Sequence, residues 1–373
     1  MSMLQRVCLV LFLCFPVLLS AQQSAAPASS PQPPAPSPSL ALALAPADES
    51  RQGRIVLSVV VTDKSGKPVS GLELKDFTLL DNNQQGKILS FHAFDGTVHS
   101  DDPPVKVILL LDTVNISFQQ VADARQQIEK FLRQKSSHLS QPMSIYLFTN
   151  DGLKFQFEPS SDGNALAADL KQVDGQLRTI GQAQAGWGDL DRVLLSVRNL
   201  DSIAQNEANS PDRKILIWVG HGWPMLNSVQ FQVSSSQGQQ QLFDSIVELS
   251  NSLREAHIAL YSISSEEGSE SISKVGGGNP FLYQDFLKGV KSVQKASFSN
   301  LGLKVLAIQS GGRVLGPSSD LVGQIASCVQ DASSFYTISF DPPRADKPQE
   351  YHDLKVIIDK PGLTAHTNTG YYN

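Results

Sequence analysis

The sequence predicts an α/β protein in which a doubly wound, mostly parallel sheet is joined to a small β-sandwich-like unit. Two observations lead to this fold class. Continuous apolar runs alternate with amphipathic helical segments between residues 103 and 332, as expected for parallel strands buried on both faces. Short β-branched segments separated by turn residues flank this region on both sides. Neither flank has enough strands to be stable alone, so we expect the two to pack together.

Composition divides the 373 residues into five parts. Residues 1–21 contain Arg6, then the apolar run Val7–Leu19 and the small residue Ala21, which is the pattern of a secretory signal peptide cleaved near Ala21. Residues 22–50 are rich in Pro, Ala and Ser, which predicts a disordered linker. The remaining parts are an N-terminal β segment at 51–102, an α/β domain at 103–332 with a loop insert at 264–296, and a C-terminal β segment at 333–373 that packs with 51–102.

Localisation and partner class follow from the same features. Cleavage of the signal predicts a secreted or periplasmic protein without an integral membrane segment, because no later stretch is apolar enough to span a bilayer. Cys8 and Cys14 leave with the signal, so Cys328 remains alone and is expected to be a buried structural thiol. The net charge is −6 and the 30 Lys and Arg residues are not clustered, which argues against nucleic acid as a partner.

The periodicity of apolar residues predicts the order of the elements. In the α/β domain we expect strands at 105–111, 143–149, 153–157, 215–219, 258–263 and 314–315, and helices at 119–135, 163–173, 189–206, 241–256, 300–309 and 320–332. In the flanking segments we expect strands at 54–62, 77–81, 88–94, 335–340, 354–359 and 364–369, with a tight connection at Asn82-Asn83. Strands that alternate with helices in this way form a largely parallel sheet covered on both faces.

Leu109-Leu110-Leu111-Asp112, at the end of the first parallel strand, resembles the von Willebrand factor A (VWA) domain. In that family this Asp begins an Asp-x-Ser-x-Ser motif, and a Thr and a second Asp from two other loops complete a divalent-ion site. Here Val114 replaces the first Ser, Gly188 replaces the Thr, and Gly220 or His221 replaces the second Asp. Divalent ions need several oxygen ligands, so we expect no bound metal and no cofactor.

A narrower resemblance covers residues 55–372. The chain is similar to the VWA-related domain proteins of the acidobacterial type, which implies an exported protein with a VWA-like domain and flanking β segments. The motifs that carry this resemblance, in chain order, are Val60-Val61-Thr62-Asp63, Leu74-Lys75-Asp76-Phe77, Lys214-Ile215-Leu216-Ile217-Trp218, Ser310-Gly311-Gly312-Arg313 and Tyr351-His352-Asp353-Leu354-Lys355-Val356.

The function that we expect is binding of a protein or a cell-envelope component, without catalysis. Loops at the carboxyl ends of the strands form the default binding face of such a sheet. We expect Trp218 in the core and Trp187 and Trp223 at least half-exposed, as interface anchors. The predicted partner-binding face consists of Asp112, Asn115, Ser117, Trp187, Asp189, His221 and Trp223.

Two alternatives remain open at this point. One is metal-dependent adhesion, with Mg²⁺ or Mn²⁺ held by a rebuilt site at Asp112, Ser117 and Asp189. The other is a hydrolase that uses Asp112 and His221. The chain has no Gly-x-Ser-x-Gly nucleophile elbow to pair with His221, so we expect that it is not an enzyme.

Overall fold

The computed structural model describes residues 53–95, 105–134, 137–154, 158–172, 188–226, 232–265 and 282–373. All of them belong to one unit, Leu40–Asn373. The predicted signal peptide at 1–21, the predicted linker at 22–50 and Trp187 lie outside the described residues. No helix in the described ranges is both long and apolar enough to span a membrane.

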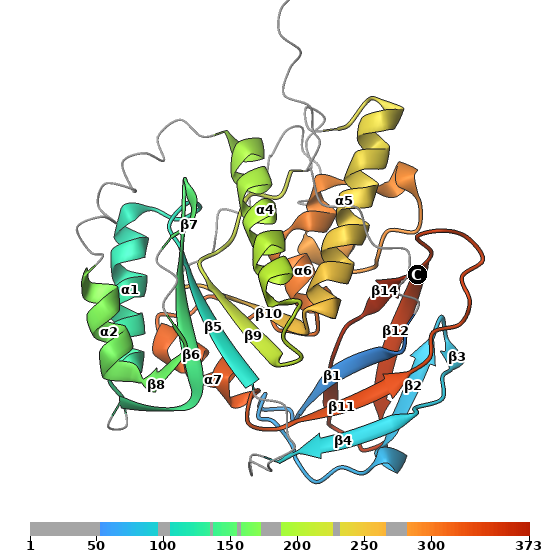
Figure 1. The fold of residues 1–373 in the computed structure, drawn as a ribbon, viewed down its shortest axis with the longest axis horizontal. Coiled ribbons are helices and arrows are strands. Elements are labelled where there is room, and N and C mark those ends of the chain that lie inside the picture. The colour runs from blue at the N-terminus through green and yellow to red at the C-terminus, as the bar shows by residue number, and fades with distance from the viewer. Residues whose placement is uncertain are drawn as a thin grey trace, which may run out of the picture. The chain divides into compact units, whose positions relative to one another are not determined.

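A six-stranded, mostly parallel sheet runs through the larger part of the structure (Figure 1). The strand order is β10-β9-β5-β6-β7, with β8 also paired to β6. The four parallel strands are β5 (Val105–Asp112), β6 (His138–Thr149), β9 (Arg213–Val219) and β10 (Ile258–Ile263). The short strands β7 (Gly152–Lys154) and β8 (Ser160–Asp162) pair antiparallel with β6. The mostly parallel sheet expected from the apolar runs is therefore confirmed.

Helices cover both faces of this sheet, and alternate residues of β5 show which helices lie on which face. Val107, Leu109 and Leu111 share one apolar core with α1 (Phe118–Leu132), α2 (Gly163–Gln172) and α7 (Leu321–Gln330). Ile108 and Leu110 share the opposite core with α4 (Asp189–Glu207), α5 (Ser236–Glu255) and α6 (Leu303–Gln309). Because both faces are covered, a central strand such as β5 must be apolar at nearly every position. Trp218 and Cys328 are fully buried, as predicted.

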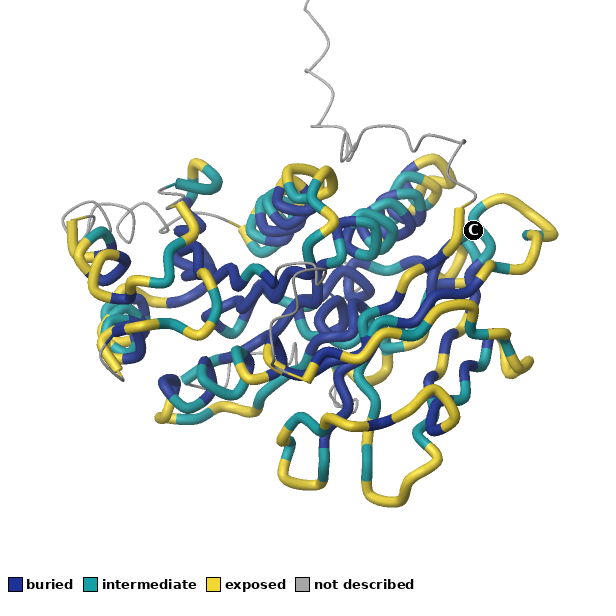
Figure 2. Tube along the Cα trace, turned by 60° about the horizontal axis from the view of Figure 1, so that its bottom comes forward, coloured by how far each residue is buried: buried dark blue, intermediate teal, exposed yellow. Residues whose placement is uncertain are grey.

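The remaining strands form two antiparallel sheets that we call the β unit, with the orders β13-β1-β11-β4 and β14-β12-β2-β3. Segments from both ends of the chain alternate in it, because β1 pairs with β11 and β2 pairs with β12. Side chains from the two sheets, including Leu57, Tyr336 and Leu354, form a third apolar core. In Figure 2, which colours the backbone trace by burial, buried residues lie in the interior and exposed residues lie on the outer loops. The bounds are β1 Ile55–Thr62, β2 Phe77–Asp81, β3 Gln84–Gln85, β4 Ser90–Phe94, β11 Phe335–Phe340, β12 Tyr351–Ile358, β13 Thr364–His366 and β14 Gly370–Tyr372.

Some local details of the structure differ from the expectations or add to them. Asn82-Asn83 makes the expected tight turn, with φ of 47° and 63°, but the chain then crosses to the other sheet. There β4 pairs with β11, and the Phe91 ring packs across the two sheets at 5.2 Å from that of Phe77. Residues 314–315 make one parallel bridge to Ser262 instead of a strand. The described part of the 264–296 insert contains 3-10 helices at Tyr283–Phe286 and Val293–Lys295.

Asp331, at the end of α7, links the parallel sheet to the β unit. Its carboxylate accepts hydrogen bonds from the Tyr261 hydroxyl at 2.9 Å and from the Arg313 guanidinium at 3.0 and 3.1 Å. The same guanidinium nitrogen donates to the Gly66 carbonyl of the β unit at 3.3 Å. The Arg213 guanidinium donates to the Asp331 carbonyl at 2.9 Å. Pairing and hydrogen bonding of this kind are what allow charged groups to be buried.

Three carboxyl groups share the interface between α4 and α5. Asp201 is on α4, and Asp244 and Glu248 are one turn apart on α5. Burial, together with the negative charges of Asp201 and Asp244, raises the pKa of Glu248 from 4.5 to about 7. Burial also raises the pKa of Asp201. Between pH 4.5 and 7 the folded protein therefore holds a proton on Glu248 that the unfolded chain has released, so stability falls as pH rises through this window.

Glu248→Gln should remove this pH dependence. We expect the melting temperature of the variant to exceed that of the wild type by about 1–3 °C at pH 8 and to match it near pH 5, since partial solvent exposure screens the repulsion. Thermal unfolding followed by circular dichroism between pH 4.5 and 8.5 measures the melting temperatures of the variant and the wild type. Asp123→Asn, which removes an exposed carboxyl from α1, is the control. A wild-type melting temperature that is constant from pH 5 to 7.5 would contradict the assignment.

Candidate functional site

The strand order places a crevice at the carboxyl ends of β5 and β9. The chain passes from β5 to β6 on one side, whereas β9 and β10 lie on the other side of β5. Open α/β sheets bind ligands where the order reverses in this way. Asp112 ends β5, and Gly220 follows the last residue of β9. We call this end of the sheet the carboxyl edge.

Asp112 is fully buried at this position, and both of its carboxylate oxygens are occupied. One oxygen accepts the backbone N–H groups of Val114 and Asn115, both at 2.9 Å. The other accepts the Asn115 side-chain amide at 2.8 Å and the Trp218 indole N–H at 2.9 Å. Burial raises the pKa of Asp112, and these hydrogen bonds oppose the rise. An ionised carboxylate accepts about four hydrogen bonds, so four N–H donors leave no lone pair for a cation.

The positions of the other expected ligands do not fit a magnesium site either. Gly188 precedes α4 and offers no side-chain oxygen. Gly220 has φ of 142°, and a Cβ atom there would lie 3.0 Å from the Cβ atom of Asp112, so a side chain at this position would be strained and crowded. Across the described ranges, no three His, Cys, Asp or Glu residues are grouped so that they could hold a metal ion.

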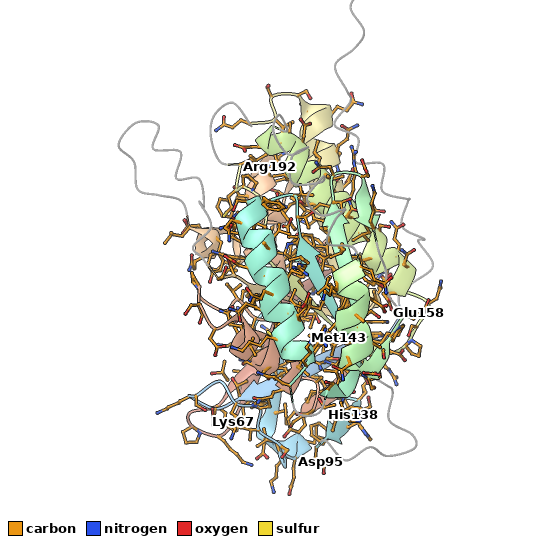
Figure 3. The ribbon with its side chains drawn as sticks, turned by 90° about the vertical axis from the view of Figure 1, so that its left-hand side faces the viewer. Lys67, Asp95, His138, Met143, Glu158 and Arg192 are labelled. Carbon is orange, nitrogen blue, oxygen red and sulfur yellow. The ribbon has the colours of Figure 1, made fainter. Side chains whose placement is uncertain are left out.

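Ser117 and Asp189, the remaining members of the alternative site, are used by their own helices. The Ser117 hydroxyl accepts the backbone N–H of Gln120 at 3.3 Å and so caps α1. Asp189 forms an ion pair with Arg192 in the first turn of α4. Figure 3 shows Arg192 at the opposite end of the molecule from Lys67 and Asp95 of the β unit. The carboxyl edge therefore lies at the end of the molecule opposite to this part of the β unit.

Side chains fill the crevice itself. The space between Ile116, Ala124, Gly220 and Leu321 measures about 10 Å³, which is the volume of one water molecule at most. The predicted exposure of Trp223 is wrong, because this residue is only 5% exposed. Its indole N–H donates to the Leu301 carbonyl at 2.9 Å, and its ring lies 5.3 Å from that of Trp218.

The predicted partner-binding face is therefore divided by burial. Asp112, Asn115 and Trp223 are buried, so they stabilise the loops of the carboxyl edge and cannot contact a partner directly. Ser117 is exposed, and Asp189 and His221 are partly exposed.

Phe118, the first residue of α1, ends the loop 112–118 that was expected on this face, although the sequence did not single it out as an anchor. Its side chain is 45% exposed. The helical period places Phe118 on the same stripe as the buried Val121, which favours burial. Its place in the first turn, at the end of the sheet, leaves it uncovered.

No protein-family model and no curated protein matches the sequence. Similar solved structures include the human COPII-coat protein Sec24c, with 8% identity, 72% of this chain and 43% of that chain covered, and a TM-score of 0.34. The pilus adhesin SpaC from Lactobacillus rhamnosus GG in its open conformation has 10% identity, covers 81% and 48%, and has a TM-score of 0.36. The chain thus spans less than half of the length of either protein. The VWA domain of SpRpn10 has 10% identity, covers 60% and 94%, and has a TM-score of 0.25.

Asp112→Asn should destabilise the fold strongly, although it is nearly isosteric. The new amide nitrogen cannot accept a hydrogen bond, so buried N–H groups of Asn115 or Trp218 lose their acceptor. We expect the free energy of unfolding to fall by about 2–3 kcal/mol, as measured by urea denaturation. Asp189→Asn removes a partly exposed ion pair and should change the free energy of unfolding by less than about 1 kcal/mol. Equal effects of the two substitutions would show that Asp112 has no special structural role.

Proposed function

We propose that this protein is an exported VWA-like binding module. Its partner is a protein or a cell-envelope component, which it engages through the loops of the carboxyl edge without a bound metal or cofactor and without catalysing a reaction. The resemblance of the sequence to VWA-related proteins supports the fold and the export, and the occupied Asp112 carboxylate supports the metal-free mode.

The observation that carries the proposal is the exposed Phe118 ring on a rigid support. Aromatic anchors near the centre of an interface contribute much of its binding energy, and a preorganised anchor loses little entropy on binding. Phe118 begins α1 directly after a reciprocal cap. The Gln120 side-chain oxygen accepts the Ser117 N–H at 2.8 Å, and the Ser117 hydroxyl accepts the Gln120 N–H at 3.3 Å. The backbone that carries the Phe118 ring is therefore fixed before the partner arrives.

Polar groups of the same edge supply the rim that such an anchor needs. His221 is partly exposed, and its Nδ1 atom lies 3.0 Å from the Gly222 carbonyl oxygen, which orients the ring. Asp189 adds a partly exposed carboxylate held by Arg192. An aromatic centre with a polar rim is the usual composition of a protein interface.

Phe118→Ala should weaken partner binding without loss of stability. We expect capture of the partner from envelope extracts of the source organism to fall at least about tenfold, since a central aromatic anchor contributes 2 kcal/mol or more. Quantitative mass spectrometry of the captured proteins gives the measurement. Leu74→Ala is the matched control, because Leu74 is also 45% exposed but belongs to the β unit.

The same assay distinguishes the metal-dependent alternative. Capture should be unchanged in EDTA and after addition of Mg²⁺ or Mn²⁺. Loss of capture in EDTA that Mg²⁺ restores would replace the metal-free mode by metal-dependent adhesion. Equal capture by wild type and Phe118→Ala would move the binding surface away from the carboxyl edge.

A further inference from the structure

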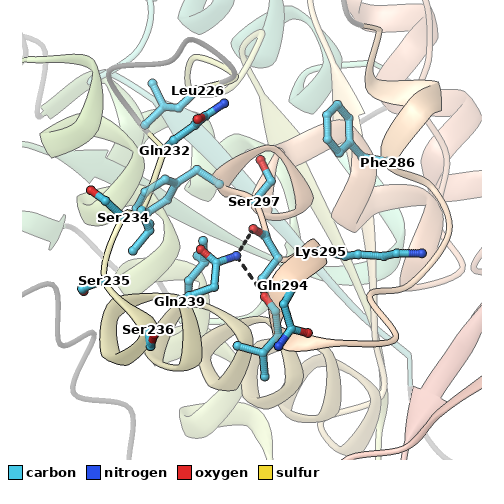
Figure 4. Close-up of a pocket in the computed structure, with 15 residues that line it drawn as sticks. Leu226, Gln232, Ser234, Ser235, Ser236, Gln239, Phe286, Gln294, Lys295 and Ser297 are labelled. Atoms are coloured by element: carbon cyan, nitrogen blue, oxygen red, sulfur yellow. Dashed lines mark hydrogen bonds between the residues drawn. The ribbon is translucent and has the colours of Figure 1, made fainter.

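A cavity of about 630 Å³ lies beside the first turn of α5 (Figure 4). One wall comes from Gln232–Ser236 and the start of α5, and the other from Phe286 and the segment Val293–Phe298. Sites for small ligands and short chain segments typically measure about 300–1,000 Å³. Because α5 follows the connection from β9, the cavity opens on the carboxyl-edge side of the sheet.

Hydrogen bonds hold the two walls at a fixed separation. The Gln239 side-chain amide donates to the carbonyl oxygens of Val293 at 2.9 Å and Ala296 at 2.7 Å, and Figure 4 shows both bonds. Nearby, the Ser299 hydroxyl donates to the Leu226 carbonyl at 3.4 Å. A site that is already formed does not lose binding energy to reorganisation.

The chemistry of the lining limits the class of ligand. Leu226, Leu242 and Phe298 provide an apolar floor, and serine hydroxyls and glutamine amides such as those of Ser234 and Gln294 provide a polar rim. Among the described residues that line the cavity, Lys295 is the one charged group, and none is an acid or a histidine. Divalent metals need acidic or histidine ligands, and polyanions need several Arg or Lys side chains. The lining therefore fits neither a metal ion nor a polyanion.

We propose that this cavity binds a segment of polypeptide through one neutral, apolar side chain. The side chain lies on the floor formed by Leu226, Leu242 and Phe298. The flanking peptide groups, each with one donor and one acceptor, pair with the hydroxyls and amides of the rim, which offer both. The inference rests on the proposed function and deepens it, because it names a peptide as the ligand and the cavity as its site.

The test is a titration of the ¹⁵N-labelled protein with capped tripeptides, acetyl-Ala-X-Ala-amide, in which X is Leu, Glu or Lys. We expect saturable chemical-shift changes at residues 232–239 and 293–298 with the Leu peptide, and at least tenfold weaker binding of the other two. Equal or tighter binding of the Glu peptide, or changes with an oligomer of N-acetylglucosamine and none with the Leu peptide, would overturn the proposal.

Two neighbouring substitutions locate the binding. Ser236 and Gln237 are both exposed in the first turn of α5, but only Ser236 lines the cavity. Ser236→Trp should weaken binding of the Leu peptide at least tenfold, and Gln237→Trp should not change it. Equal binding to both variants rejects the cavity as the site.

Partner capture separates this inference from the proposed function. If capture depends on Phe118 but is unchanged in Ser236→Trp, the carboxyl edge stands as the partner surface and the cavity is rejected. If the Leu peptide binds as expected while Phe118→Ala captures normally, the cavity stands and the Phe118 anchor is rejected.

Discussion

The buried carboxylate of Asp112 is the constraint on which the carboxyl edge depends. Its two oxygens join the end of β5, the turn that leads to α1 and the indole of Trp218 on β9. Burial of a carboxylate is costly unless donors replace its water, and four N–H groups do so here. The family that this sequence resembles uses an Asp at this position to bind an ion. In this chain the Asp at the same position accepts hydrogen bonds from the protein's own N–H groups instead. The exposed Phe118 follows the turn that these bonds fix.

A second buried carboxylate organises the opposite end. Asp331 binds Tyr261 of β10 and Arg313, and Arg313 reaches the Gly66 carbonyl in the β unit. The β unit therefore has a direct polar connection to Asp331 at the end of α7 and, through Asp331, to β10, the edge strand of the parallel sheet. Removing one partner from such a group leaves a buried charge without compensation, which costs several kcal/mol. Both ends of the parallel sheet are thus fixed by charges that are inaccessible to a partner.

Local patterns in the sequence determine the strands and helices but not the long-range contacts. Continuous apolar runs predicted β5, β9 and β10, and the same reasoning placed Trp218 in the core. The sequence predicted that Trp223 is at least half-exposed, yet its indole N–H donates to a carbonyl oxygen 78 residues further along the chain. The cavity is formed by walls more than 50 residues apart, and β4 leaves the sheet of β2 and β3 and pairs with β11 in the other sheet. Neither contact has a local signature. The loss of ligands at Gly188 and Gly220 was visible in the sequence, whereas the saturation of Asp112 was not.

Hydrogen exchange of the Trp218 indole N–H tests the central claim most directly, because this N–H donates its hydrogen bond to the Asp112 carboxylate. We predict that it exchanges only through global unfolding, with the protection of the β5 core amides, and that 10 mM Mg²⁺ leaves the rate unchanged. Fast exchange in the apo protein that Mg²⁺ alters would show that the carboxylate is available to an ion, and would contradict a metal-free edge built on Asp112.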